Sequence, residues 1–207
     1  MNLSYRATLA VIFAAAVFSA VSCKKSSDET PEPMPGNSVV IDGKPYPTIA
    51  IANQVWTAAN YAGTGGVPYD QNNTHPEYGR YYTFAELQQI TIPPGWRLPV
   101  RNDFVELVNG QGADLSTPLE NTAALQKITS KNNWIHVPGT NTTGFNAYPA
   151  GYIYGNAQPD DGEVAEFWTS ERITFSIQES GQLDKLAVRF YGNSEDGYRF
   201  PVRFIKQ

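Results

Sequence analysis

The pattern of hydrophobic and polar positions changes along the chain from Val39 onward, and each change predicts an element. Two apolar runs flank Asp42-Gly43, and Asp-Gly between such runs is a strong hairpin signal because this turn requires positive φ angles. In the second run Ile49 and Ile51 alternate with smaller residues, and the run reaches Trp56. This period of two predicts a half-buried strand that continues as far as Trp56.

Helical spacing occurs in the middle of the chain. A Gly- and Asn-rich loop over residues 63–79 is followed by a short predicted helix around Thr83–Gln89. A longer helix is predicted to begin at Asn102, which we expect to cap the free backbone N–H groups of the first turn. The apolar positions of this helix fall on one face and comprise Phe104, Leu107 and Val108.

The next helix is predicted over residues 117–128. Thr117 is expected to cap it, Pro118 takes the first helical position, and Glu120 completes a capping box. Strand signals then dominate, at residues 144–155, 166–172, 185–192 and 198–207. This order predicts an α+β fold in which two helices pack on antiparallel sheets connected by long loops.

The stretch Pro94–Leu107, PGWRLPVRNDFVEL, joins the strands to the longer helix. Its prolines favour an extended backbone ahead of the helix, because helical φ and ψ angles are disfavoured for a residue that precedes proline. Trp96 and Leu98 are predicted to be buried anchors, as are the other tryptophans. Arg97 is expected to point the other way and to pair with a carboxylate. The stretch is therefore predicted to be a structural joint and not a site.

The first 37 residues predict targeting and attachment. Residues 1–22 contain Arg6 and an apolar run of about 15 residues, which suits a signal peptide and is too short to span a membrane. Small residues precede Cys23, an arrangement that resembles a bacterial lipobox, so Cys23 is the predicted lipidation site. Residues 23–37 are rich in Ser, Pro and charge and are expected to form a disordered tether. Residues 38–207 would then be the folded domain.

Composition excludes several classes of protein. The formal net charge is −5 and the Lys and Arg residues are scattered, so no broad basic face for nucleic acid is expected. Cys23 is the single cysteine of the sequence, which rules out an internal disulfide and a cysteine-rich metal cluster.

Six segments together resemble the Fibrobacter succinogenes major paralogous (FISUMP) domain, a family of bacterial surface lipoproteins. They occur in the family's order and comprise Ile41–Tyr61, Tyr78–Leu87, Pro94–Leu107, Thr143–Gly155, Phe167–Glu171 and Val202–Lys206. The resemblance implies a C-type-lectin-like fold with a variable face of long loops. It also implies an outer-membrane or cell-surface location in a Bacteroidota-type bacterium.

Two positions depart from the family pattern. Where many members carry cysteines, this chain has Ile92 and Phe204, so packing is expected to replace a cross-link. The C-type-lectin-like superfamily also contains formylglycine-generating enzymes. Their chemistry requires reactive cysteines that this sequence lacks, so the resemblance does not imply that activity here.

No enzyme motif with its required spacing is present. The sequence lacks a nucleophile elbow, a phosphate-binding loop and a dinucleotide-binding glycine motif. Its two histidines, His75 and His136, belong to no metal-spaced cluster. We therefore expect no enzymatic activity, although paired carboxylates of a hydrolase are defined by their separation in space and not by sequence.

The strongest candidate for ligand binding is the segment 157–163, AQPDDGE. Gln158-Pro159-Asp160 repeats a tripeptide found in the calcium site of galactose-selective lectins, and Asp160, Asp161 and Glu163 supply oxygen ligands suited to calcium. The alternative is a polar turn, since Pro-Asp-Asp-Gly is good turn chemistry. The full set of candidate ligand-binding residues is Tyr152, Tyr154, Gln158, Asp160, Asp161, Glu163, Asn193, Glu195 and Asp196.

These observations favour one function over two others. The leading hypothesis is a lipid-anchored binding or adhesion module that presents its loops to a glycan, a peptide or a partner surface protein. The second is a structural component of a surface assembly that binds no small ligand. The third is a hydrolase with its carboxylates on the loops. No cofactor is expected, and calcium at Asp160, Asp161 and Glu163 is the one candidate.

Overall fold

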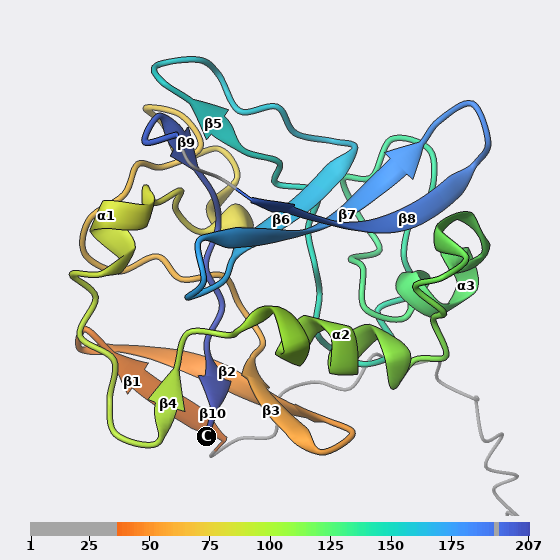
Figure 1. Ribbon diagram of the computed structural model, residues 1–207. Coiled ribbons are helices and arrows are strands. Elements are labelled where there is room, and N and C mark those ends of the chain that lie inside the picture. The colour runs from red at the N-terminus through yellow and green to blue at the C-terminus, as the bar shows by residue number, and fades with distance from the viewer. Residues whose placement is uncertain (1–36, 193–194) are drawn as a thin grey trace, which may run out of the picture.

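A computed structural model describes residues 37–192 and 195–207, and this part of the chain is mostly β (Figure 1). The strands are β1 (Ser38–Ile41), β2 (Lys44–Ile51), β3 (Gln54–Thr57), β4 (Trp96–Arg97), β5 (Ile153–Tyr154), β6 (Val164–Trp168), β7 (Ile173–Ser180), β8 (Lys185–Gly192), β9 (Tyr198–Arg199) and β10 (Ile205–Lys206). The helices are α1 (Phe84–Leu87), α2 (Arg101–Asn109) and α3 (Thr122–Gln126), with 3₁₀ turns η1 (Pro76–Tyr78) and η2 (Pro118–Glu120). None of the described helices is long and apolar enough to cross a membrane.

The strands form three sheets in the described residues, ordered β1-β2-β3-β10-β4, β5-β9 and β6-β7-β8. The predicted α+β, C-type-lectin-like fold built on two helices and antiparallel sheets is wrong as a description of the whole, because strands in three sheets dominate the described residues and the helices are few and short. One predicted helix, over 117–128, is broken into η2 and the five-residue α3. The expected capping box does not form, because the Thr117 hydroxyl donates to the Asp114 carbonyl and caps no helical N–H group. An entire strand, β7, was not predicted.

The amino-terminal hairpin confirms the Asp-Gly prediction. Asp42 and Gly43 have φ angles of 51° and 72°, and Ile41 pairs with Lys44 across the turn. The run predicted to continue to Trp56 contains a second hairpin, since Ile51 pairs with Gln54 and Ala52 has a φ of 51°. That turn was missed because it carries no glycine to mark the positive φ.

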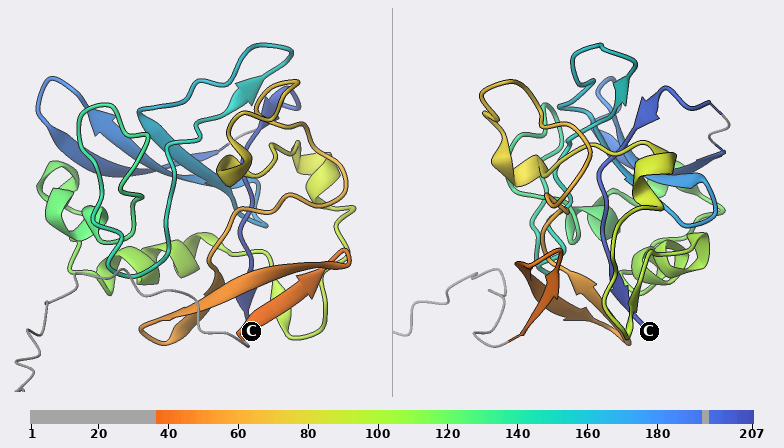
Figure 2. Two further views of the ribbon diagram at one scale, coloured as in Figure 1. Left: turned by 180° about the vertical axis from the view of Figure 1, so that it is seen from behind. Right: turned by 90° about the vertical axis from the view of Figure 1, so that its left-hand side faces the viewer.

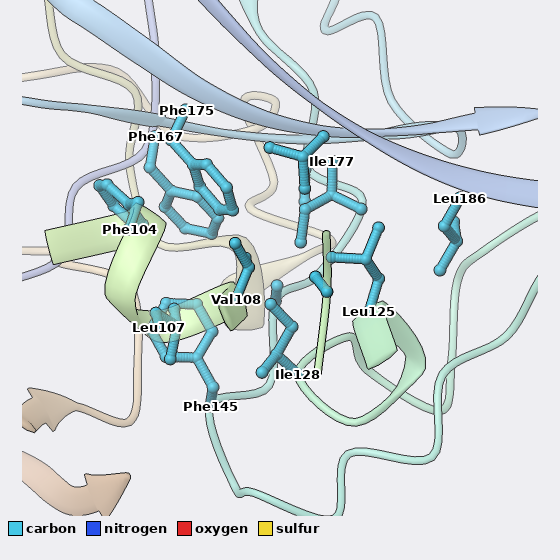
Figure 3. Close-up of a cluster of buried hydrophobic side chains, with 14 of the residues drawn as sticks. Phe104, Leu107, Val108, Leu125, Ile128, Phe145, Phe167, Phe175, Ile177 and Leu186 are labelled. Carbon is cyan, nitrogen blue, oxygen red and sulfur yellow. The ribbon is translucent and has the colours of Figure 1, made fainter. Parts of the chain in front are cut away.

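The main core lies between one face of the β6-β7-β8 sheet and the helices α2 and α3. Figure 3 shows side chains of α2 and α3 directed toward those of the sheet. The rings of Phe104 and Phe175 stack with centroids 4.3 Å apart. The fully buried members of this cluster include Phe104, Leu107, Val108, Leu125, Ile128, Phe145, Phe167, Phe175, Ile177 and Leu186. Burying each such side chain contributes about 1.5–3 kcal/mol, so this cluster fixes the position of the sheet on the helices.

The joint at Pro94–Leu107 confirms the prediction for Arg97 and corrects the one for Asn102. Arg97 forms a two-pronged ion pair with Asp103, with Nη–Oδ distances of 2.5 and 2.8 Å. The same carboxylate accepts a hydrogen bond from the backbone N–H of Val100, the residue at the N-cap position of α2. Asn102 lies inside the helix instead and donates to Glu106. Trp96 and Leu98 are half-buried against the core cluster that contains Phe204.

The carboxyl-terminal segment 197–206 runs through the middle of the molecule and connects its parts; it is the dark blue trace between β9 and β10 in Figure 1. We call it the central segment. Its backbone carbonyls accept hydrogen bonds from amides of distant segments, at Gly155, Tyr82, Trp168, Tyr61 and Thr57. Phe204 is buried in the same cluster against which Ile92 packs, as expected if packing replaces a cross-link at these positions.

Arg203 lies in this segment and is fully buried, with an exposed fraction of 0%. Its guanidinium donates to Asn60 Oδ1 (2.5 Å), to the Thr57 carbonyl (2.6 Å) and to the Asn146 carbonyl (3.1 Å). The group also lies 4.9 Å from the centroid of the Phe145 ring, within cation–π range. Burial lowers the pKa of Arg203 to about 9, so the group remains charged at neutral pH.

The substitution Arg203→Met tests this arrangement. Three oxygen acceptors, two of them in buried hydrogen bonds and one in a part-buried one, would lose their donor. An unsatisfied buried polar group costs about 1–3 kcal/mol. We therefore expect the free energy of unfolding, measured by urea titration with tryptophan fluorescence, to fall by at least about 3 kcal/mol. Arg189→Met removes an exposed arginine and should change it by less than about 0.5 kcal/mol. Equal stability of the two variants would contradict this account.

Candidate functional site

The strands β5 and β9 form a short ribbon whose two faces border two different cavities. Ile153 pairs with Arg199, and Tyr154 pairs with Tyr198. Because side chains alternate along a strand, Ile153 and Arg199 share one face, while Tyr154 and Tyr198 share the other. Figures 1 and 2 show this ribbon beside the loop that precedes α1 and above the β6-β7-β8 sheet.

The first cavity, which we call the loop cavity, lies on the Ile153–Arg199 face and has a volume of about 660 Å³. Its polar lining comes from two loops and from the ribbon, and comprises Tyr69, Asp70, Gln71, Asn72, Asn156, Gln158 and Arg199. The volume lies within the range of roughly 300–1,000 Å³ that is usual for ligand sites. The loop cavity is therefore large enough for a small ligand, and both loops and the ribbon supply hydrogen-bonding groups to its lining.

Local interactions fix the walls of the loop cavity. The Asp70 carboxylate accepts hydrogen bonds from the backbone N–H groups of Asn72 and Thr74 and from the Thr74 hydroxyl, which lowers the pKa of Asp70. Arg199 pairs with Glu86 at 2.5 Å. Glu86 in turn completes the capping box of α1 with Thr83. The ribbon is thus held to the first helix through one carboxylate.

The loop that contains the predicted residues 157–163 folds back along the segment before the ribbon. The Asp160 amide donates to the Tyr152 carbonyl, and the Gly162 amide donates to the Pro149 carbonyl. Gly151 lies under this loop with a φ of 60°, and a Cβ there would be 1.7 Å from the Asp160 carbonyl oxygen. Only glycine allows the two segments to approach this closely.

The three predicted calcium ligands contact different neighbours. Asp161 accepts from the hydroxyl of Tyr69 at 3.2 Å, whereas Glu163 lies 3.7 Å from His136 Nε2. Asp160 is exposed and adjoins the Tyr152 hydroxyl. Asp160, Asp161 and Glu163 do not form a group of ligand atoms within 4.8 Å of one another, judged over the described residues.

A group of that kind does form elsewhere in the described residues, from His136, Glu163 and Glu179. Glu163 and Glu179 come together because β6 pairs with β7, and the Glu179 amide donates to the Glu163 carbonyl. Glu179 accepts hydrogen bonds from the backbone amides of His136 and Val137, so its carboxylate anchors the loop that carries the histidine. Sequence spacing gave no sign of this group, since its members come from three separate segments. The other histidine, His75, stacks on Tyr78 and contacts Glu77 at 2.9 Å.

The remaining predicted residues lie near the outer end of the ribbon or outside the described part. Tyr154 is 50% exposed, and its hydroxyl donates to Glu195 Oε2 at 3.1 Å. Asp196 pairs with Arg172 at 2.5 Å. Asn193 and Cys23 lie outside the described residues, as do the predicted signal peptide and all but the last residue of the predicted tether.

The second cavity lies between the other face of the ribbon and the β6-β7-β8 sheet, and we call it the glutamate cavity. Its volume is about 330 Å³, and its lining residues are Tyr152, Glu166, Gln178, Tyr191, Gly192, Tyr198 and Phe200. Glu166 is 5% exposed and accepts a hydrogen bond from the Thr174 hydroxyl. Burial raises the pKa of Glu166 to about 7.

Comparison with known proteins identifies the family. The model of the Fibrobacter succinogenes major domain matches residues 49–206. The chain belongs to the Fibrobacter succinogenes major domain family. Comparisons with curated proteins and with solved structures found no similar protein. The family part of the resemblance is thus confirmed, and the matched region contains both cavities of this Fibrobacter succinogenes major domain.

Sequence reasoning found some of the residues that line the two cavities and missed others. It selected Tyr152, Tyr154 and the loop after them, but neither Glu166 nor Arg199. One signal for Glu166 was present, since VAEFW places a carboxyl inside an apolar strand, where a charged residue is rarely buried without a partner. The polar lining at 70–72 could not be recognised from sequence, because Asp, Gln and Asn are also typical of a solvent-exposed loop that binds nothing.

Replacing Gly151 by alanine should displace the loop that carries Gln158 and destabilise the protein. The new methyl group would clash with the Asp160 carbonyl, beyond the strain of about 1–3 kcal/mol expected at this φ. Gly155→Ala is the matched control, because Gly155 has the same φ of 60° and open space around it. Thermal unfolding should show a larger loss for Gly151→Ala than for Gly155→Ala. Equal losses would mean that the close approach of Gly151 to the Asp160 carbonyl does not contribute to stability.

Proposed function

We propose that this protein is a lipid-anchored binding module of the bacterial cell surface and that it binds a glycan in the loop cavity. The observation that carries the proposal is the composition of that cavity. Carboxamide side chains of Gln71, Asn72, Asn156 and Gln158 line it together with Arg199. Such groups both donate and accept hydrogen bonds, and they match the vicinal hydroxyl groups of a sugar.

The ring of Tyr69 supports the same ligand class. Tyrosine offers an apolar face with a polar tip, a combination suited to a sugar ring. Tyr69 is held by its hydrogen bond to Asp161 and by an edge contact with His75. A fixed aromatic ring lowers the entropy lost on binding, because one side chain fewer must be ordered.

Binding is preferred here to hydrolysis. A glycoside hydrolase that follows the common mechanism uses two carboxyl groups, about 5–9.5 Å apart, across the scissile bond. Among the described residues that line each cavity there is a single carboxyl group, Asp70 in the loop cavity and Glu166 in the glutamate cavity. Asp70 is also engaged in its own loop, as described above.

The binding site can be tested on a glycan array with the chain from Lys24 onward, which keeps every described residue. We expect binding that weakens at least about tenfold in the double variant Asn72→Ala, Gln158→Ala, the loss expected from one or two hydrogen bonds. The array is run with calcium and with a chelator, which decides whether the ion takes part.

Asn132→Ala is the matched control for this experiment, because Asn132 is exposed and lines neither cavity. It should bind as the wild type does. Absence of any bound glycan in both conditions, or unchanged binding by the double variant, would contradict the proposal.

Membrane attachment is proposed through acylation of Cys23. Two or three acyl chains anchor a protein stably, since each buried methylene contributes about 0.8 kcal/mol. Cys23→Ala should abolish incorporation of labelled fatty acid and should release the protein from the membrane fraction. Incorporation of label into the variant would show that the anchor lies elsewhere.

A further inference from the structure

The glutamate cavity holds an ionisable group that has no counter-ion among the residues the structure describes. Glu166 lies in β6, and its Oε1 atom accepts from Thr174 in β7. The ion pairs of the described residues do not include Glu166. Arg189, on the same face of the sheet by its pairing with Ser176, is exposed and forms no such pair. A carboxylate taken out of water without a partner is costly, and a cation in the cavity would offset that cost.

A second buried polar atom lies beside this carboxylate. Ser176 is paired directly with Glu166 across the β6–β7 register, so both side chains are on the same face of the sheet. Ser176 is 0% exposed, and its hydroxyl has no hydrogen-bond partner within the described part of the chain. Unsatisfied buried hydroxyls are uncommon in native proteins. Within the described residues, this part of the sheet thus combines a carboxyl group that has no counter-ion with a hydroxyl that has no hydrogen-bond partner.

Aromatic rings form the opposite wall. Tyr152 lies with its ring centroid 5.8 Å from that of Tyr198 and 5.9 Å from that of Phe200. Tyr198 and Phe200 stack at 5.7 Å. Tyr191, at the rim, donates its hydroxyl hydrogen to Gln178 Oε1. Faces of aromatic rings attract cations, most strongly where water is excluded.

We propose that the glutamate cavity binds an alkylammonium group, with the Glu166 carboxylate as its counter-ion and the rings of Tyr152, Tyr198 and Phe200 as its walls. The carboxylate neutralises the charge, and the rings surround the alkyl substituents. This site is separate from the loop cavity, on the opposite face of the ribbon, and the inference does not depend on the glycan proposal. Primary and quaternary amines share this chemistry, and the test separates them.

The test uses the chain from Lys24 onward and small probes, with binding followed by NMR titration and calorimetry at pH 8. The probes are n-butylammonium, choline, and 3,3-dimethylbutan-1-ol, which is a neutral isostere of choline. We expect at least one cation to bind at least tenfold more tightly than the neutral alcohol. If choline binds and n-butylammonium does not, the natural group is quaternary, and the reverse result indicates a primary amine.

Glu166→Gln is the decisive variant. The amide keeps an acceptor for the Thr174 hydroxyl and removes a buried charge, so the variant should fold with a melting temperature at pH 8 no lower than that of the wild type. It should bind the preferred cation at least tenfold more weakly. Tyr198→Leu should also weaken binding, whereas Glu120→Gln, an exposed glutamate outside the cavity, should not.

Affinity should also depend on pH in one direction. The other ionisable side chains that line the cavity are those of Tyr152, Tyr191 and Tyr198. Asp160 adjoins the Tyr152 hydroxyl, and the exposed Arg189 lies on the same sheet face as Glu166. Phenols stay neutral between pH 5.5 and 8, so Glu166 is the group that ionises in this window. Binding should strengthen over this range in the wild type and stay constant in Glu166→Gln. Equal affinity for the cation and the neutral alcohol, or unchanged binding by Glu166→Gln, would overturn the inference.

Discussion

The buried guanidinium of Arg203 is the interaction on which the rest of the structure depends. A charge that is fully removed from water must be held by several oriented acceptors. Here the acceptors come from two segments far apart in the chain: Thr57 and Asn60, at and just after the end of β3, and Asn146, before the ribbon. Asn60 is itself oriented by a hydrogen bond to the Tyr78 carbonyl. Since neither of these segments could satisfy the cation alone, both must be in place together.

The same constraint explains how both cavities are formed. The central segment contains Arg203, Phe200 and β9. The segment that crosses the core therefore also positions one strand of the ribbon. Phe200 exchanges backbone hydrogen bonds with Tyr82, and the Trp168 indole donates to the Tyr82 carbonyl. With the ribbon held on both sides, its alternating side chains separate an amide-lined cavity from an aromatic and acidic one. The function proposed for each follows from which face of the ribbon it borders.

Local rules predicted some of this from sequence and failed where distant segments decide. The Asp42-Gly43 hairpin and the Arg97 ion pair were predictable, because each rests on residues only a few positions apart. Asn102 was wrongly predicted to cap α2, since Asp103 serves both Arg97 and the helix end. The predicted helix over 117–128 failed because tertiary packing overrides a weak capping pattern. The two sides of the glutamate cavity come from two sheets, one made by β6, β7 and β8 and the other by β5 and β9, and a single sequence does not record how these strands pair.

Native-state hydrogen exchange tests most directly whether the central segment organises the molecule. The amides of Thr57, Tyr61, Tyr82 and Trp168 all donate to carbonyls of that segment. If it is integral to the core, these amides should exchange only through global unfolding, with the same free energy as the most protected amides of β7. The contrary result would be their exchange through a local opening at a free energy several kcal/mol lower, while β7 stays protected. The ribbon and its cavities would then open independently of the core.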